Sequence, residues 1–344
     1  MGGIETQVSG LVEYQKSQGH DVFVLTLTPG DDLAGVVRFP FHIPGDLLWH
    51  PKGKSLSARS LRELEADIVH LHFGAASPFA WDGMKAVVDL GIPSVATVHS
   101  IWGNVARRLY SVTSRKWKTK TVFSSVSAVS SAIVSKSLKR EVAVAHNGVD
   151  IDFWRGEPEV ESKRIEIVSA TRFASRKRIR QQISVIESVV KQLGEKSPHF
   201  TIAGTGPDFK HIEKLVQAKK LQDFITLTGR LDKVQLRDLY LKSDLFLQMS
   251  ILEAFGIAAC EARAAGLPVL TRKGSGVSEF VEEASTGYLE ESDSQIVKRI
   301  VGFVANRDLL RELKINSKSN PPIQTWQHAD KQVATLYQQA INQG

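Results

Sequence analysis

The stretch that decides the fold spans residues 245–261 and reads Leu245-Phe246-Leu247-Gln248-Met249-Ser250-Ile251-Leu252-Glu253-Ala254-Phe255-Gly256-Ile257-Ala258-Ala259-Cys260-Glu261. Its first residues form an apolar run that predicts a buried strand. A short loop with one carboxylate, Glu253, leads to Gly256 and then to small residues that predict a helix. A strand, a glycine turn and a helix in this order are typical of parallel α/β sheets.

Apolar runs of the same kind recur along the chain in two series, which predicts two doubly wound domains. The predicted strands are residues 22–27, 68–72, 94–98 and 142–145 in the first series, and 166–170, 200–203, 225–227, 245–248 and 268–270 in the second. A polar stretch at 150–163 separates the series. We therefore expect domains at residues 1–150 and 151–324, with the predicted C-terminal helix at 325–344 returning to the first domain.

The first predicted domain begins without the strand that usually opens such a domain, because the sequence starts at the turn that follows it. A missing central strand would leave unpaired backbone groups on its neighbours, which is costly when they are buried. We expect either a clipped sequence, which we favour, or a first sheet that lacks its central strand.

The composition excludes several classes of protein. The 344 residues carry 44 Lys and Arg against 37 Asp and Glu, so a net charge of +7 suits an anionic partner such as a nucleotide, a phospholipid surface or a nucleic acid. A single cysteine, Cys260, excludes an intrachain disulfide and a four-cysteine zinc site. The sequence offers neither a spanning helix nor a signal peptide. A reduced, cytoplasmic protein, soluble or peripheral, is the expectation.

The predicted helix start around Gly256 is a candidate ligand-binding site. Free N–H groups and the helix dipole favour an anion such as a diphosphate there, and Gly256 allows it to approach the backbone. Glu253 can accept hydrogen bonds from sugar hydroxyls, and Glu261, one turn into the helix, can bind a ribose diol. The competing interpretation is that both are solvated helix charges, but their position beside an apolar strand favours function.

Other polar residues follow predicted strands. Arg172 and Lys177 lie in the loop after 166–170 and can clamp a diphosphate, unless they belong to a merely basic surface loop. Gly204 and Gly206 form a glycine turn after another strand, where ligands of parallel sheets bind, although turn formation alone also explains them. His99 ends the strand at 94–98 and is predicted to point into an interdomain cleft.

Two possible metal motifs are present. His70 and His72 share one face of a strand, but no third ligand is apparent, so we interpret them as cleft lining. Asp150 and Asp152 form an Asp-x-Asp in the linker, a location that makes metal binding unfavoured. We expect no metal site.

A basic interval occupies residues 105–140 and contains no acidic residue. Leu109, Tyr110 and Trp117 lie among nine cations, Arg107, Arg108, Arg115, Lys116, Lys118, Lys120, Lys136, Lys139 and Arg140. Such an interval can bind anionic lipid headgroups or track a nucleic-acid backbone, or it can simply be a solubilising face. A lipid surface is favoured over the solubilising face, and nucleic acid is not expected.

Glu253 and Glu261 together resemble the Glu-x7-Glu signature of retaining GT-B glycosyltransferases, in particular glycosyltransferase family 4. Residues 266–270, 274–280 and 286–288 are also similar to that family, and the resemblance spans nearly the whole chain. It implies a GT-B fold, in which two Rossmann-like domains face a central cleft. The first domain would bind the acceptor and the second the nucleotide sugar.

The resemblance also implies roles for individual residues. Arg172 and Lys177 would stabilise the leaving diphosphate, Glu253 would hold the sugar, and His99 would contact the transferred sugar. Nucleotide-sugar binding would involve the remaining matched positions, Gly2, Gly3, Gly204, Gly206, Arg230, Phe255, Gly256, Ile257 and Glu261.

The implied activity is retaining transfer of a hexose, of mannose or glucose type, from a nucleotide diphosphate sugar to an acceptor hydroxyl. The acceptor would be a lipid-linked or cell-envelope glycan, and the site a peripheral location on the inner face of the plasma membrane. No cofactor or metal is implied. Two alternatives stay open: a sugar-nucleotide 2-epimerase of the same fold, and a non-catalytic basic relative that binds lipid or nucleic acid.

Overall fold

The computed structural model describes residues 3–39, 41, 49–114, 121–156 and 163–343. The chain divides into two compact units, one of residues 1–148 together with 326–344 and one of residues 149–325. Every strand pairing between the named strands is parallel, and helices connect most of the consecutive strands. The predicted α/β class with parallel sheets is confirmed.

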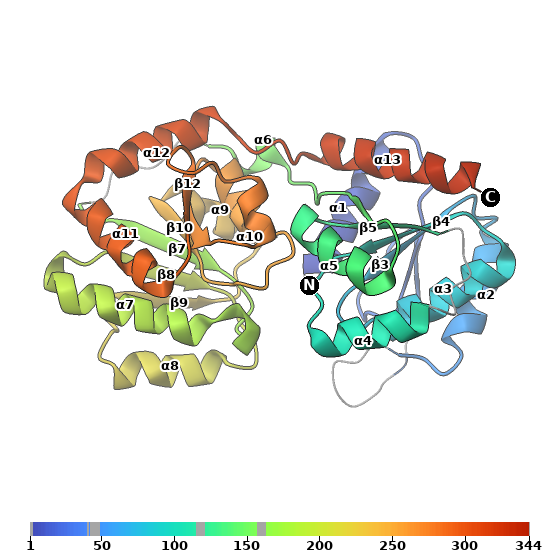
Figure 1. Cartoon of the computed structure of the whole chain (residues 1–344), viewed down its shortest axis with the longest axis horizontal. Coiled ribbons are helices and arrows are strands. Elements are labelled where there is room, and N and C mark those ends of the chain that lie inside the picture. The colour runs from blue at the N-terminus through green and yellow to red at the C-terminus, as the bar shows by residue number, and fades with distance from the viewer. Residues whose placement is uncertain (1–2, 40, 42–48, 115–120, 157–162, 344) are drawn as a thin grey trace. The chain divides into compact units, whose positions relative to one another are not determined.

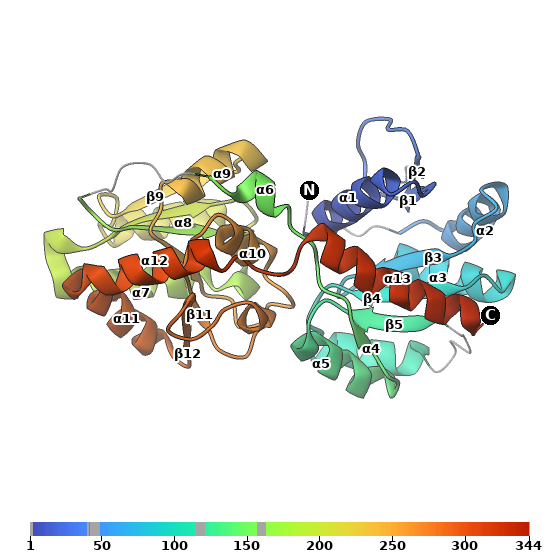
Figure 2. The same ribbon diagram turned by 90° about the horizontal axis from the view of Figure 1, so that it is seen from above.

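The first unit holds two separate parallel sheets rather than one. Its described elements are α1 (Gly3–Ser17), β1 (Val24–Thr26), β2 (Val36–Arg38), α2 (Gly53–Glu63), β3 (Val69–Phe73), α3 (Pro78–Leu90), β4 (Ser94–Val98), α4 (Asn104–Thr113), β5 (Val122–Ser125), α5 (Ala128–Leu138), β6 (Ala143–Val144) and α13 (Trp326–Asn342). β1 pairs with β2, and a second sheet has the order β3-β4-β5-β6. Figure 2 shows β1 and β2 as a separate pair beside α1. This division matches the expected lack of a central strand.

Helices cover both faces of the four-stranded sheet. One face packs against α2, α3, α4 and α5 through an apolar core that contains Phe73, Met84 and Val134. The other face packs against α13 through Val95, Val333 and Leu336. Figure 1 shows α13 on one side of this sheet and α3, α4 and α5 on the other. Both faces are covered, and all five residues of β4, Ser94–Val98, are accordingly buried.

The second unit has one six-stranded sheet of order β12-β11-β10-β7-β8-β9. Its elements are α6 (Ile151–Trp154), β7 (Glu166–Ala170), η2 (Ser175–Lys177), α7 (Ile179–Leu193), η3 (Gly194–Lys196), β8 (His199–Ala203), α8 (Phe209–Ala218), β9 (Ile225–Gly229), α9 (Lys233–Leu241), β10 (Leu245–Gln248), α10 (Ile257–Ala264), β11 (Val269–Arg272), η4 (Gly276–Glu279), β12 (Gly287–Glu290), α11 (Asp293–Ala305) and α12 (Arg307–Ser319). Figure 1 shows α7 and α8 on one side of the sheet and α9 and α10 on the other.

The strand order places β7 beside β10 at the centre of this sheet. The connections run away from this pair in opposite directions, so a topological switch point lies between the two strands. Ligands of open α/β sheets bind outside the carboxyl ends of the strands at such a point. The loops after β7 and β10 are therefore the first place to look for a site.

The predicted strands are confirmed with shifts of one or two residues at most ends, and those at 94–98, 166–170 and 245–248 have the predicted bounds. The sequence interpretation missed β2, β5 and β12. Among the described residues, no helix combines the length and apolar character that crossing a bilayer requires.

Candidate active site

The loop after β10 carries Glu253 and is held tightly against the loop that follows β11. The amide of Gly276 donates a hydrogen bond of 2.9 Å to the carbonyl of Glu253. A Cβ on Gly276 would overlap the carbonyl of Ala254, and one on Gly256 would overlap a methyl of Val277. Gly256 also has a φ of 91°, which favours glycine. The turn into α10 therefore depends on these glycines.

Lys177 and Glu253 meet across the central strands of the second unit. The Lys177 Nζ lies 2.5 Å from Glu253 Oε2, and the side chains are 15% and 14% exposed. Gln248, at the end of β10, donates a second hydrogen bond of 3.1 Å to the same Oε2. Two residues predicted separately, in the loops after β7 and β10, are thus brought together, and Gln248 is a partner that sequence reasoning missed.

Glu261 lies on α10 and is partly buried. Removal from water raises its pKa to about 8, and the charge of Lys233 opposes this shift only in part. The carboxyl is therefore largely protonated at neutral pH, and it can both donate and accept a hydrogen bond. Either capacity suits a diol ligand.

A neutral Glu261 has a consequence for stability. Between the unfolded value of 4.5 and the folded value of about 8, the folded chain holds a proton that the unfolded chain releases, so stability falls as pH rises through this window. Glu261→Gln, which is always neutral, should remove this dependence. We expect its melting temperature to exceed that of the wild type more at pH 8.5 than at pH 5, by scanning calorimetry. An equal difference at both pH values would contradict the assignment.

The glycine turn after β8 packs directly on the loop after β7. A Cβ on Gly204, whose φ is 130°, would overlap the Thr171 carbonyl, and one on Gly206 would overlap that of Phe173. The Phe173 amide donates to Thr205 with 3.0 Å, and the Gly204 amide donates to Gly229 with 2.7 Å. The two glycines therefore allow three consecutive strand ends to lie close together.

The remaining predicted site residues of the second unit differ in how far their side chains are exposed. Arg172 and Arg230 have exposed side chains, in the loops after β7 and β9. Phe255 is 2% exposed and its ring packs 5.3 Å from that of Phe280, so only its backbone can face a ligand. Ile257 is the first residue of α10.

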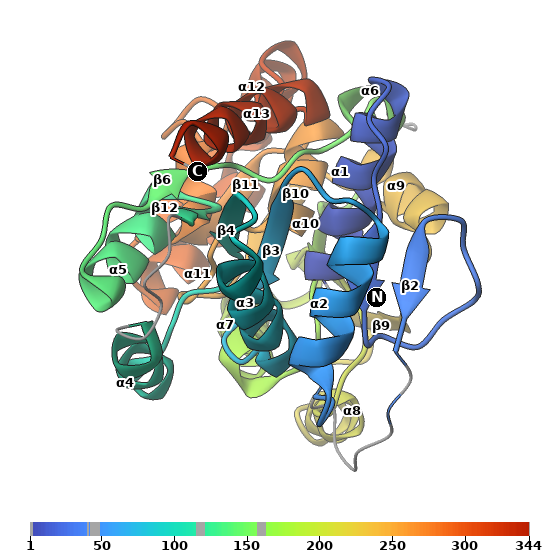
Figure 3. The ribbon, with the colours of Figure 1, turned by 90° about the vertical axis from the view of Figure 1, so that its right-hand side faces the viewer.

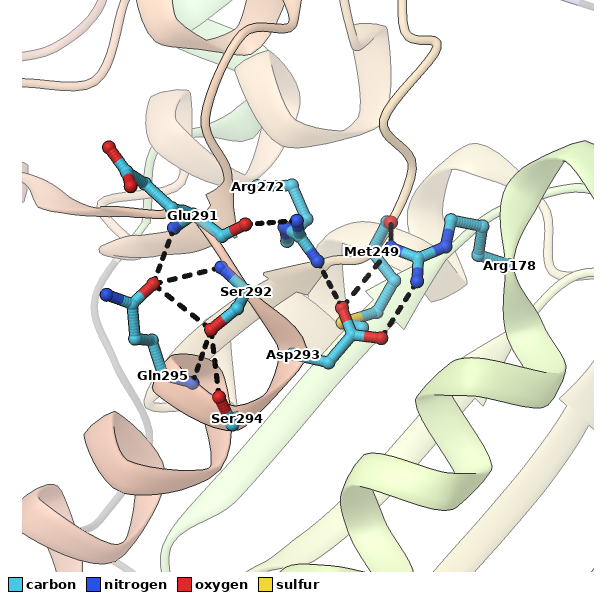
Figure 4. Close-up of polar contacts among 8 residues, drawn as sticks. All are labelled: Arg178, Met249, Arg272, Glu291, Ser292, Asp293, Ser294 and Gln295. Atoms are coloured by element: carbon cyan, nitrogen blue, oxygen red, sulfur yellow. Dashed lines mark hydrogen bonds and ion pairs between the residues drawn. The ribbon is translucent and has the colours of Figure 1, made fainter.

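An ion-pair network fixes the residue after Lys177 (Figure 4). Arg178 Nη2 lies 2.8 Å from Asp293 Oδ2, and its Nη1 donates at 3.5 Å to the carbonyl of Met249. Arg272 pairs with the same carboxylate and also donates to the carbonyl of Glu291. Arg178 has a φ of 58°, a left-handed conformation that is unfavourable for a residue with a side chain. The network holds it there and was not predicted.

Three histidines of the first unit form a connected cluster. His72 Nδ1 lies 2.9 Å from His99 Nε2, and the His70 and His72 ring centroids lie 4.2 Å apart with the rings tilted by 30°. His70 bonds to Tyr337 of α13 with 3.0 Å and to Thr97 of β4 with 2.6 Å. His99 directly follows β4, as predicted, and its side chain also forms a hydrogen bond with Asn147. A cavity of about 20 Å³ in this unit is lined by all three imidazoles.

Burial keeps these imidazoles neutral. It lowers the pKa of His72 to about 4 and those of His70 and His99 well below the usual 6.5. Below pH 6.5 the unfolded chain takes up protons that the folded chain does not, so stability falls as pH drops from 6.5 towards 4. His70→Gln should weaken this dependence in urea unfolding between pH 7.5 and 5, whereas exposed His211→Gln should not. Equal slopes in both variants would contradict this.

One residue of the Asp-x-Asp pair, Asp150, has a structural role. The Asp150 side chain accepts a hydrogen bond of 3.0 Å from the amide of Phe153 and caps α6. Across the part of the chain that the structure describes, no group of three or more His, Cys, Asp or Glu side chains could hold a metal ion. Gly3 begins α1, whereas Gly2 and residues 115–120 of the basic interval lie outside the described residues.

Comparison with known proteins places this geometry in a family. Residues 150–320 match the family model described as glycosyl transferases group 1, and residues 1–153 match that of glycosyltransferase family 4. The chain is 23% identical to the alpha-monoglucosyldiacylglycerol synthase of Acholeplasma laidlawii, over 99% of this chain and 94% of that protein.

Two solved structures share the fold. The sucrose-phosphate synthase of Thermosynechococcus elongatus has a TM-score of 0.80 at 18% identity, over 100% of this chain and 94% of that one. Anabaena HepE, solved with UDP and glucose, has a TM-score of 0.77 at 17% identity, over 97% and 95%. The fold class is GT-B, as the sequence predicted. Because the two family models together cover residues 1–320, the chain belongs to the group 1 glycosyltransferases of family 4 and is an enzyme that transfers sugars.

Proposed function

We propose that this enzyme transfers a hexose of mannose or glucose type, with retention of configuration, from a nucleotide diphosphate sugar to an acceptor hydroxyl. The observation that carries the proposal is the contact between Lys177 and Glu253 beside the start of α10. A diphosphate supplies the negative charge that Lys177 needs when Glu253 turns to the sugar, and Gln248 remains to hold Glu253.

The residues of the second unit would divide the donor between them. Lys177, Arg172 and the first N–H groups of α10 would bind the diphosphate, and Glu261 would bind the ribose. Gly204, Gly206 and the backbone near Arg230 would shape the nucleotide pocket. The buried hydroxyls of Thr171 and Ser275, in the loops after β7 and β11, have no hydrogen-bond partner among the described residues, which supports a polar ligand there.

Catalysis would rest on electrostatics and alignment. Charge develops on the diphosphate as the bond to the sugar breaks, and fixed cations stabilise that charge more than they stabilise the bound donor. The leaving phosphate would take the acceptor proton, so the mechanism needs neither a covalent enzyme intermediate nor a metal. His99, held by His72 in the first unit, would position the transferred sugar.

The acceptor we propose is a lipid-linked or cell-envelope glycan, reached at the inner face of the plasma membrane. The named activity of the Acholeplasma relative, glucosyldiacylglycerol synthesis, supports a lipid acceptor. The +7 net charge is consistent with an anionic surface.

A direct experiment combines donor binding with product analysis. Calorimetry with UDP-, GDP- and ADP-sugars should show saturable binding of one donor, and incubation with membrane lipid extract should give an α-glycoside, in the presence of chelator. Release of an epimerised nucleotide sugar without transfer would favour the 2-epimerase. Absence of binding to every donor would favour the non-catalytic relative, and loss of activity in chelator would contradict the metal-free mechanism.

A further inference from the structure

A hollow on the second unit lies between α11, the start of α12 and the end of β12. Its volume is about 450 Å³, which is within the range of small-molecule pockets. β12 is an edge strand of its sheet, and α11 lies beside it and leads into α12 (Figures 1 and 3). None of the residues that line the hollow is among those assigned to the sugar donor, so it is a second candidate site.

Gly302 leaves the hollow open over α11. It lies in the last turn of this helix, although glycine is a poor helix former. A Cβ at this position would meet nothing within 4 Å, and the backbone does not adopt a conformation that requires glycine. Phe303 and Leu309 supply apolar surface beside it. Neither strain nor packing within the described chain explains this glycine, whereas close approach of a ligand to the helix does.

Arg299 is held in a fixed orientation at the wall of the hollow. Its Cζ lies 3.6 Å from the ring centroid of Tyr288, and its Nε donates a hydrogen bond of 2.8 Å to Glu290. Its two terminal nitrogens form no hydrogen bond with the part of the chain that the structure describes. Lys298, exposed at the same wall, forms no ion pair with a described residue. A preoriented guanidinium beside an ammonium group suits the oxygens of a phosphate.

The other polar groups of the hollow suit hydroxyl groups. The Glu290 carboxylate accepts one hydrogen bond from Arg299 and can accept others. Gln295 uses its Oε1 for the amides of Glu291 and Ser292, at 2.9 Å each, so its Nε2 is the group that it can offer to a ligand. One acceptor and one donor beside an apolar surface match the alternating hydroxyl and CH groups of a sugar ring.

We propose that this hollow binds a phosphate monoester of a monosaccharide. Arg299 and Lys298 bind the phosphate, and Glu290 and the Gln295 amide bind hydroxyl groups of the sugar. A nucleotide fits less well, because a base needs an open aromatic face. Arg299 covers the ring of Tyr288, and Phe303 is 1% exposed, so neither of these rings offers such a face. The binding site does not depend on the proposed function.

The hollow is connected to Lys177 through α11. Gln295 forms a capping box with Ser292 at the start of this helix, and Asp293 in the same turn pairs with Arg178 (Figure 4). A ligand bound to Gln295 holds this first turn and thereby holds Arg178 beside Lys177. We therefore expect bound sugar phosphate to raise kcat/KM for transfer about fivefold, at the lower end of typical couplings between sites. This consequence, unlike the binding itself, rests on the proposed function.

The test is titration calorimetry of the full chain with the 1- and 6-phosphates of glucose and of mannose, and with inorganic phosphate and free glucose as separate arms. We expect saturable binding of a sugar phosphate, weaker binding of phosphate and none of glucose. Gly302→Leu should abolish binding because leucine fills the hollow, and its melting temperature should equal or exceed that of the wild type. Lys298→Gln should weaken binding about tenfold. Lys214→Gln, in an exposed lysine of α8, is the matched control and should bind as the wild type does.

Three results would overturn the inference: no binding of any sugar phosphate, inorganic phosphate that binds as tightly as they do, or binding that survives Gly302→Leu. Lys177→Met separates the hollow from the donor site, because it should lose transfer and keep sugar-phosphate binding. Sugar-phosphate binding without any transfer from a nucleotide sugar would support the hollow and reject the proposed function, and the reverse result would do the opposite. An unchanged transfer rate with the hollow occupied would reject the connection through α11.

Discussion

Lys177→Met is expected to lower kcat/KM for sugar transfer by at least about a hundredfold, because removal of one preorganised charge from a developing anion costs on that scale. Methionine keeps the length of the side chain and removes only its charge. In the wild type the Lys177 Nζ lies 2.5 Å from Glu253, and both side chains are about 15% exposed, so little water is present to replace the lost cation. The loss should appear mainly in kcat, with a smaller change in donor affinity.

The control is a second lysine–glutamate pair in the same unit. Lys273 lies 3.2 Å from Glu291, but these side chains are 62% and 70% exposed. Lys273→Met should therefore leave transfer and stability within error of the wild type. Glu253→Gln should also abolish most transfer. Gln248 can still donate a hydrogen bond to the side-chain oxygen at position 253, so this variant removes only the negative charge. Near-normal turnover in Lys177→Met, with folding unchanged, would remove this residue from the mechanism.

The pairing of Lys177 with Glu253 shows what the sequence could predict. Each residue follows an apolar run that is recognisable as a buried strand, and loops at the carboxyl ends of parallel strands share one edge of the sheet. The adjacency of β7 and β10 was not in the sequence pattern, because strand order is set by the crossover connections and not by the strands themselves. The prediction of both residues was therefore possible, but that of their contact was not.

Other features were missed for physical reasons. β5 ends in Ser124 and Ser125, polar residues whose hydroxyls bond to Thr97 and to the Val98 carbonyl inside the sheet, so no apolar run marks it. β12 opens with a glycine and ends with Glu290, and β2 has only three residues. The contacts of His70 with Tyr337 and of Arg178 with Asp293 join residues more than a hundred positions apart. Only the folded chain reveals such pairs.

Asp293→Ala is expected to destabilise the second unit by about 2 kcal/mol, less than for a fully buried pair because these side chains are partly exposed. Arg178, Arg272 and Asp293 are 20%, 15% and 32% exposed, and the variant would leave two guanidinium groups facing each other without a counter-charge. For a unit of this size, the melting temperature should fall by about 5 °C.

Activity should fall with stability in this variant. Arg178 holds a left-handed φ of 58° next to Lys177, and without Asp293 its backbone is free to relax and to carry Lys177 away from Glu253. We expect about a tenfold loss of kcat/KM at a temperature where the variant is fully folded. A displaced Lys177 would stabilise the developing charge on the diphosphate less well than a correctly placed one.

Asp308→Ala provides the comparison, because Asp308 also stands in the first turn of a helix and pairs with an arginine, Arg311, at 2.8 Å. That pair is 87% and 51% exposed, so its loss should change neither the melting temperature nor transfer measurably. Equal effects of Asp293→Ala and Asp308→Ala would mean that the interaction of a first-turn carboxylate with the helix dipole alone accounts for Asp293. A larger effect confined to Asp293→Ala would tie the strained backbone at Arg178 to the placement of Lys177.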